Sequence, residues 1–146
     1  MRSVADFYQD CQAVAHAVPP LDVKLADAVS CVLAEDVQAP FNLPVADLSA
    51  CDGYAVRVRD CEGATLETPV TLPVTEEIRA GAVDPAALVP GTAIRIASGA
   101  PMPSGAEAVV SLEFTDHGVA QVALRTAPAS GENIRRRAED VAQGET

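Results

Sequence analysis

The sequence predicts a mainly β protein with N-terminal helices, an α+β fold. Apolar residues recur at helical spacing only near the start of the chain. From Pro40 onward, prolines interrupt short runs of β-branched residues, which is typical of short strands. The 146 residues, 49% apolar and 21% charged, are enough for one ordinary domain or two small lobes with a core.

An amphipathic helix is expected over residues 4–16. Ser3 and Asp6 have the spacing of a capping box, with Asp in the position usually held by Glu. Apolar residues then recur three and four positions apart at Val4, Phe7, Cys11, Val14 and Val18. Pro19 and Pro20 should end this helix, because neither supplies a backbone N–H. A second helix is expected over residues 25–33, followed by an extended stretch over residues 34–39.

The rest of the chain is expected to form short strands over residues 54–58, 70–74, 93–96, 108–112 and 119–124. A short helical turn is expected over residues 84–88. Residues 115–118, Thr-Asp-His-Gly, form a turn-favouring cluster between the last two strands. These two strands are therefore predicted to pair as a hairpin.

Charge and composition exclude several classes of function. Ten basic residues against 21 acidic ones give a net charge of −11, which repels polyanions, so nucleic acid and anionic lipid are not expected partners. No apolar run approaches the roughly 18 residues of a membrane helix. Asp6 and Asp10 stand where a signal peptide would need its apolar stretch, so we expect a cytoplasmic protein. The four cysteines form no C-x-x-C pair and are expected to be buried free thiols.

Two segments combine small and polar residues next to a predicted strand. In residues 47–56, Ser49 and Asp52 either cap backbone N–H groups of a turn, or a hydroxyl and the carboxylates of Asp47 and Asp52 converge on a ligand. In residues 95–103, tiny residues would let the backbone approach a ligand closely, with Ser98 offering its hydroxyl. The ending of a phosphate-binding loop is missing from this segment.

A third segment, residues 131–140, contains an arginine triplet followed by two acidic residues. In an extended chain, Arg135 and Arg137 would share a face while Arg136 points away. Such a pair could clamp a phosphate or another oxyanion. The alternative is a set of surface ion pairs with Glu139, Asp140 and other acidic residues, which contribute little stability.

Taken together, these segments resemble the N-terminal part of the molybdopterin molybdenumtransferases, the bacterial MoeA family related to the E domain of gephyrin. The resemblance covers nearly the whole chain. It is carried by residues 25–28, 32–37, 49–56, 95–103, 105–110 and 131–137 with 139–140.

The resemblance implies both an architecture and an activity. Family members insert molybdenum from molybdate into adenylylated molybdopterin, a pterin nucleotide, and release AMP, with magnesium involved. Residues 1–43 and 138–146 would form an elongated, helix-rich lobe, and residues 44–137 a β-rich lobe inserted into it. Family active sites lie between the two subunits of a homodimer, so a second copy of the chain is an expected partner.

The resemblance also assigns roles to residues. Asp52 and Ser98 are the expected catalytic residues, and Arg135 and Asp140 the expected substrate-binding residues. Arg137 joins the substrate-binding set through the clamp that it could form with Arg135. No metal ligand is assigned.

Three positions depart from the family pattern. Cys51 stands where Met is usual, a change of volume, and Ser98 stands for Thr and keeps the hydroxyl. Ala138 follows the arginine triplet where Gly is usual. Alanine is compatible with this position only if the backbone φ there is not positive.

Full family members continue into an α/β domain and a small β domain that lie beyond the residues matched here. The end at Thr146, within the segment returning to the first lobe, favours a fragment of a longer enzyme over a stand-alone relative. The isolated chain is then expected to be inactive. Two alternatives are a non-catalytic dimerisation or scaffold module related to this family, and an unrelated β-rich binding domain.

Overall fold

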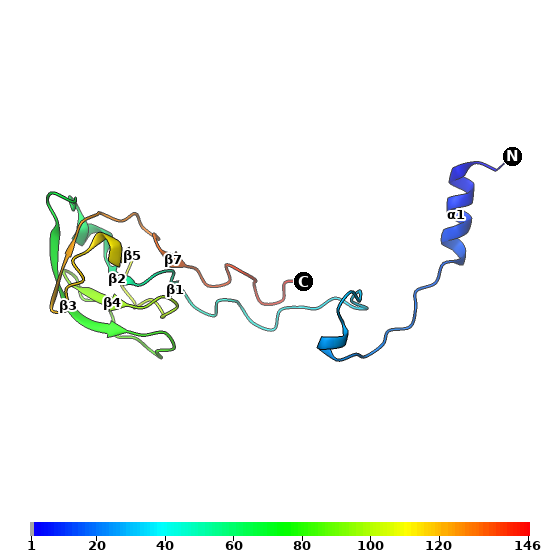
Figure 1. The fold of residues 1–146 in the computed structure, drawn as a ribbon, viewed down its shortest axis with the longest axis horizontal. Coiled ribbons are helices and arrows are strands. Elements are labelled where there is room, and N and C mark those ends of the chain that lie inside the picture. The colour runs from blue at the N-terminus through cyan, green and yellow to red at the C-terminus, as the bar shows by residue number, and fades with distance from the viewer. Residues whose placement is uncertain (1) are drawn as a thin grey trace. The chain divides into compact units, whose positions relative to one another are not determined.

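The computed structural model describes residues 2–146. The chain divides into two compact units, Met1–Val37 and Gln38–Thr146 (Figure 1). The first unit holds a single α-helix and the second holds all of the β-strands in the described residues. This confirms the predicted mainly β fold with an N-terminal helix. None of the described helices has both the length and the apolar character needed to cross a lipid bilayer.

The first unit contains the helix α1 (Val4–Val14), which begins at the predicted capping box. The Ser3 hydroxyl accepts a hydrogen bond from the Asp6 N–H, and the Asp6 carboxylate accepts one from the Ser3 N–H, both at 3.1 Å. The predicted second helix over residues 25–33 is wrong, because only a 3-10 turn, η1 (Leu25–Asp27), forms there. Ser30 has a φ of 69°, a left-handed conformation in which a right-handed helix cannot continue.

The apolar residues of the first unit remain exposed. Within residues 2–37 no side chain is buried, and only Ala28 is half-buried. Exposed fractions reach 61% for Phe7, 92% for Leu25 and 93% for Val32. This unit therefore has apolar surface and no core of its own.

The second unit is built on a curled five-stranded sheet (Figure 1). Its strands, in spatial order, are β5 (Ala108–Ser111), β2 (Gly53–Val56), β4 (Ala93–Ile96), β3 (Val70–Ile78) and β6 (Gln121–Leu124). The pair β3 and β4 is parallel and the other pairs are antiparallel. A smaller antiparallel pair joins β1 (Leu48–Ser49) to β7 (Ile134–Arg135). The 3-10 turns η2 (Val58–Cys61) and η3 (Leu112–Phe114) follow β2 and β5.

Both faces of this sheet are covered by apolar side chains. One face packs Tyr54 and Val56 of β2 against Val110, Val122 and other buried residues of the neighbouring strands. The other face packs Ala55 against residues that include Ile94, Ile96, Val109 and Leu88. Because β2 lies between two strands and is buried along its whole length, it fixes the position of the residue that immediately precedes it, Asp52.

Strands form close to the predicted segments, but their pairing differs from the prediction. The predicted hairpin between residues 108–112 and 119–124 is wrong, because β5 pairs with β2 whereas β6 pairs with β3. The turn cluster does form a turn, in which the Asp116 carboxylate accepts the N–H groups of Gly118 and Ala123. A single bridge between Thr115 and Leu124 joins the two ends of the curled sheet. The helical turn expected over residues 84–88 is also absent from the described residues.

All four cysteines are free thiols, but only one is buried. Cys61 lies in the core, where burial raises the pKa of its thiol to about 11. Cys51 is half-buried, whereas Cys11 and Cys31 are exposed. The expectation of buried thiols is wrong for these last two because they belong to the unit that has no core.

Residues 38–43 run beside the C-terminal residues 138–146 (Figure 1). The Leu43 N–H donates to the Val141 carbonyl at 2.9 Å, and the Ala39 N–H donates to the Glu145 carbonyl at 2.8 Å. These two stretches belong to the same compact unit as the sheet. The division into lobes of residues 1–43 with 138–146 and of residues 44–137 stays a prediction.

Ala138 lies at the start of this pairing, with its N–H donating to the Pro44 carbonyl at 3.0 Å. Its φ is 64°, so the backbone here is left-handed, the conformation that glycine adopts without strain. We expect Ala138→Gly to raise the free energy of unfolding by about 0.5–1 kcal/mol, because relief of strain exceeds the added flexibility of the unfolded chain. Urea unfolding measures this change, and a loss of stability would contradict the reasoning.

Gly53, the first residue of β2, is required for a different reason. A Cβ atom at this position would lie 2.2 Å from the Val110 carbonyl oxygen, in the backbone of the adjacent strand. We expect Gly53→Ala to cost about 3 kcal/mol or more, because a buried strand must move to remove the clash. The same unfolding measurement tests this, and a change below about 0.5 kcal/mol would show that the strands separate easily.

Candidate functional site

Asp52 and Ser98, the two predicted catalytic residues, lie in direct contact. One oxygen of the Asp52 carboxylate, Oδ1, accepts the backbone N–H of Ser98 at 2.7 Å, and the Ser98 hydroxyl donates to the Ala50 carbonyl at 3.4 Å. Both residues are exposed. Asp52 precedes β2, and Ser98 follows β4 in a loop of small residues, so two paired strands bring them together.

Residues 47–50 hold this loop in place through their backbone. The Met102 N–H donates to the Asp47 carbonyl at 3.0 Å, the Gly99 N–H donates to the Ser49 carbonyl at 2.9 Å, and the Ser49 N–H donates to the Ala100 carbonyl at 2.9 Å. A further bridge pairs Leu48 with Pro101. The loop that carries Ser98 therefore pairs with residues 47–50 through backbone hydrogen bonds, as a neighbouring strand would.

The Ser49 hydroxyl is buried and bonds to the backbone of the chain. Ser49 is 2% exposed, and its hydroxyl donates to the Cys51 carbonyl at 2.6 Å. Asp47 and Asp52 are also bound to protein groups, Asp47 through both carboxylate oxygens. The capping interpretation of residues 47–56 therefore holds for Asp52, which accepts a backbone N–H, and is wrong for Ser49, whose hydroxyl donates to a carbonyl instead.

The arginine triplet lies along the other side of residues 47–50. Leu48 pairs with Arg135 and Ser49 with Ile134 in the β1–β7 ladder, and the Ala50 N–H donates to the Asn133 carbonyl at 2.9 Å. Asn133 is fastened in turn to β5, because its side-chain amide donates to the Val109 carbonyl at 2.8 Å. Residues 47–50 thus separate the Ser98 loop from the triplet and bond to both.

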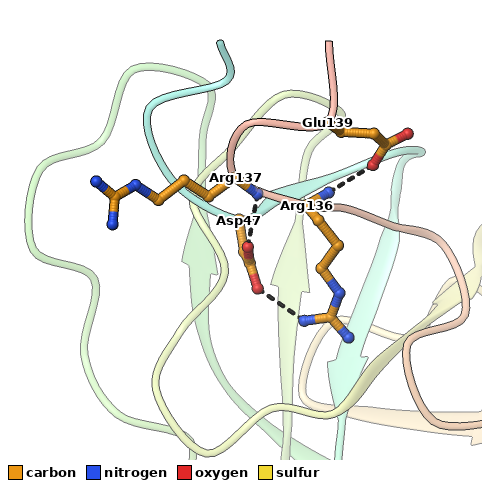
Figure 2. Close-up of polar contacts among 4 residues, drawn as sticks. All are labelled: Asp47, Arg136, Arg137 and Glu139. Atoms are coloured by element: carbon orange, nitrogen blue, oxygen red, sulfur yellow. Dashed lines mark hydrogen bonds and ion pairs between the residues drawn. The ribbon is translucent and has the colours of Figure 1, made fainter. Parts of the chain in front are cut away.

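Each arginine of the triplet has different surroundings. The guanidinium of Arg135 pairs with Asp140, and that of Arg136 donates to Asp47 at 2.7 Å. Figure 2 shows the side chain of Arg137 directed away from Arg136, while its backbone N–H donates to Asp47 at 2.8 Å. Within residues 2–146, Arg137 makes no ion pair. The alternation expected for an extended chain does not apply to Arg137, since β7 ends at Arg135.

These contacts shift the protonation of the groups involved. The hydrogen bond from the Arg137 N–H is the main cause of the lowered pKa of the Asp47 carboxyl. Partial burial raises this pKa, and the hydrogen bond and charge of the Arg136 guanidinium lower it further. Asp140 raises the pKa of Arg135. Burial, followed by the charge of Asp52, raises the pKa of the Cys51 thiol, so this thiol is not activated as a nucleophile.

A small open pocket of about 140 Å³ lies beside Asp52. Its other charged lining residues are Glu77 and Arg95, which are paired in register across the parallel strands β3 and β4. Sequence reasoning did not identify these two, nor did it give Asp47 its role of holding the triplet. Strand register would have been needed to find Glu77 and Arg95, and no short motif carries that information.

Residues 2–146 contain no group of three or more His, Cys, Asp or Glu side chains that could hold a metal ion. The magnesium implied by the resemblance stays a prediction. What the arrangement offers is one exposed carboxylate beside a hydroxyl, and exposed guanidinium groups with different degrees of pairing.

Comparison with known proteins identifies the family. The family model of the MoeA N-terminal region (domain I and II) matches residues 2–146. A Mycobacterium tuberculosis (strain ATCC 25618 / H37Rv) relative, "Molybdopterin molybdenumtransferase 2", is 50% identical over 146 residues, which are 100% of this chain and 36% of that protein. A Bacillus subtilis (strain 168) "Molybdopterin molybdenumtransferase" is 40% identical over 126 residues, 84% of this chain and 29% of that protein.

A solved structure gives the same result. The molybdopterin biosynthesis MoeA protein from Pyrococcus horikoshii OT3 superposes with a TM-score of 0.77 at 38% identity, over 85% of this chain and 33% of that chain. The chain spans only about a third of the length of these relatives. Its sequence and its fold agree with theirs over the residues that match, and the chain belongs to the family of MoeA N-terminal regions.

Proposed function

We propose that this chain is the N-terminal, substrate-facing and dimerising part of a molybdopterin molybdenumtransferase and acts in molybdenum cofactor biosynthesis. The observation that carries the proposal is the 50% identity to a relative of that name over all 146 residues. In the proposed reaction, molybdenum from molybdate enters adenylylated molybdopterin and AMP is released. Molybdate and the pterin nucleotide are both substrates in this scheme.

Asp52 and Ser98 are proposed to act at the reacting end of the substrate. Asp52 uses one carboxylate oxygen to hold the Ser98 N–H, and its side chain remains exposed. Its second oxygen makes no hydrogen bond to any residue of the described part of the chain, so it can accept a proton or a hydrogen bond from a ligand. The Ser98 hydroxyl can turn from its long 3.4 Å bond to donate to the same ligand.

Arg135, Arg137 and Asp140 are proposed to bind the anionic groups of the substrate. Guanidinium groups recognise phosphate oxygens through pairs of parallel hydrogen bonds. Asp140 orients Arg135 through their ion pair and keeps that side chain from moving freely. Because the chain has a net charge of −11, phosphate groups would be attracted only close to these arginines.

A cytoplasmic location is part of the proposal. All four cysteines are free, which is usual where glutathione and thioredoxin keep thiols reduced.

The chain is also proposed to associate with a second copy of itself through residues 2–37. Exposed apolar residues recur along this whole stretch, which contains no buried side chain. Surface of this kind is usually covered by a partner, and symmetric pairs of identical chains are the commonest assemblies. The same observation supports the second candidate function, a dimerisation or scaffold module without catalytic activity.

A chimera separates these two functions. When this chain replaces the matching part of the Mycobacterium tuberculosis relative, we expect molybdenum cofactor formation and AMP release from adenylylated molybdopterin and molybdate. Asp52→Asn in the chimera should lower the rate roughly 100-fold, because the acceptor that holds Ser98 remains while the charge is lost.

The matched control is Asp84→Asn, which neutralises an exposed aspartate of the second unit without a side-chain hydrogen bond to any residue from 2 to 146. It should leave the rate unchanged. A folded, dimeric chimera without cofactor formation would favour the scaffold function, and full activity of the Asp52→Asn chimera would rule out the role given to Asp52.

Association is tested by light scattering on the 146-residue chain. We expect a dimer with twice the 15.1 kDa mass of one chain. Phe7→Glu should shift the mass toward that of the monomer, because a charge would then lie within the apolar contact. Phe114→Glu is the control, since Phe114 is 51% exposed, close to the 61% of Phe7, but lies in the β-rich unit. The mass of a monomer for the unsubstituted chain at all concentrations would overturn the proposed association.

A further inference from the structure

The Asp47 carboxylate bonds to two consecutive residues of the arginine triplet. Its Oδ2 accepts the Arg136 guanidinium at 2.7 Å, and its Oδ1 accepts the Arg137 backbone N–H at 2.8 Å (Figure 2). One rigid carboxylate therefore contacts a side chain and the next peptide group at once. This combination fixes the direction in which the chain, and with it the side chain of Arg137, leaves the triplet.

Asp47 is itself held from the other side. Its carbonyl oxygen accepts the Met102 N–H at 3.0 Å, and Leu48, the next residue, pairs with Arg135 and bridges Pro101. The Asp47 side chain is only half-exposed. The carboxylate is thus presented from a well-anchored segment rather than from a loose loop.

Two neighbouring contacts fasten the same turn. The Glu139 carboxylate accepts the Arg136 backbone N–H at 2.7 Å (Figure 2). The Pro44 carbonyl accepts the Ala138 N–H at 3.0 Å. With Asp47 on the intervening N–H, three successive backbone N–H groups, at positions 136, 137 and 138, are bound. The backbone on both sides of Arg137 is therefore fixed.

The arginines differ in what remains available to a ligand. The guanidinium groups of Arg135 and Arg136 are each paired with a carboxylate. That of Arg137 has no carboxylate within ion-pair distance in residues 2–146 and points away from Asp47 (Figure 2). Arg137 is therefore suited to bind an anion, because its backbone is held in place and its guanidinium has no acidic partner within residues 2–146.

We propose that Asp47 is a positioning residue that occupies Arg136 and directs Arg137 toward a phosphate group of the substrate. This inference rests on the proposed function, because it concerns the same anionic substrate. Arg136 then has a structural role, although it stands between two substrate-binding residues. The sequence separates Arg136 from Arg135 and Arg137 only by the alternation of an extended chain, and it does not connect Asp47 with the triplet.

The test measures binding of inorganic pyrophosphate to the 146-residue chain at low ionic strength, by calorimetry and by the NMR signal of the Arg137 Nε–H. We expect Arg137→Ala to weaken binding at least about 10-fold. Arg136→Gln should change affinity by less than about 2-fold, because Asp47 can still bind the Arg137 N–H.

Asp47→Ala gives the most discriminating result, because alanine offers no acceptor to the Arg136 guanidinium or to the Arg137 N–H. It removes a negative charge and releases Arg136, so a simple counter-ion effect would strengthen pyrophosphate binding. Loss of positioning predicts the opposite, a weakening of about 3- to 10-fold, together with loss of the pyrophosphate-induced shift of the Arg137 signal. Glu67→Gln, which neutralises an exposed acid without a hydrogen bond within the described chain, is the charge control and should not weaken binding.

Asp47→Glu keeps the charge and moves the carboxylate by one methylene, so it tests the geometry if the alanine variant does not fold. It should also weaken binding. Unchanged or tighter binding by either folded Asp47 variant would overturn this inference and leave the proposed function standing. Failure of the unsubstituted chain to bind pyrophosphate would overturn the inference and the proposed anion contact together, whereas an inactive chimera with intact pyrophosphate binding would count against the proposed enzyme alone.

Discussion

The backbone of residues 47–50 is hydrogen-bonded on both sides. On one side it bonds to the loop that contains Ser98, and on the other it bonds to the strand that contains Arg135. Neither of these outer segments is a strand of the five-stranded sheet, although residues 132 and 133 also bond to Val109 of β5. The two segments are aligned with each other through this short central stretch. The burial of Ser49 adds to the constraint, because an unpaired N–H or carbonyl at a buried position would be costly.

This arrangement also explains how an acidic protein can present positive charge locally. Acidic side chains fix the triplet from several directions: Asp140 holds Arg135, and Asp47 holds Arg136. Such exposed pairs contribute little stability singly, about 0.2–1 kcal/mol each, so their main effect here is on geometry. They determine which guanidinium groups are occupied and where the next one points.

Local sequence signals predicted local structure well. The capping box marked the start of α1, and β-branched runs located β2, β4 and β5 within a residue or two. Long-range pairing was not predictable in the same way: the turn at residues 115–118 suggested a hairpin, whereas β6 instead pairs with β3. The second helix failed because its apolar residues have no core to pack against, and the weak helical preference of residues 25–33 is not enough without one.

In the candidate site, too, local features were predictable and long-range contacts were not. Motifs identified Asp52, Ser98 and the triplet, because these residues are close in sequence to recognisable turns and strands. The role of Asp47 depends on a contact with residues 89 and 90 positions away along the chain, and the pairing of Glu77 with Arg95 depends on strand register. The sequence did not determine whether the φ of Ala138 is positive, and the structure shows that it is.

Amide hydrogen exchange of the β-rich unit tests most directly whether residues 47–50 unite the two outer segments. The amides to compare are those of Gly99 and Met102 on one side, and of Ala50 and Arg137 on the other. If the segments form one cooperative assembly, all four exchange with a similar free energy of opening and respond together to mild denaturant. Rapid exchange of Gly99 and Met102 while Ala50 and Arg137 remain protected would show two independent segments and contradict this description.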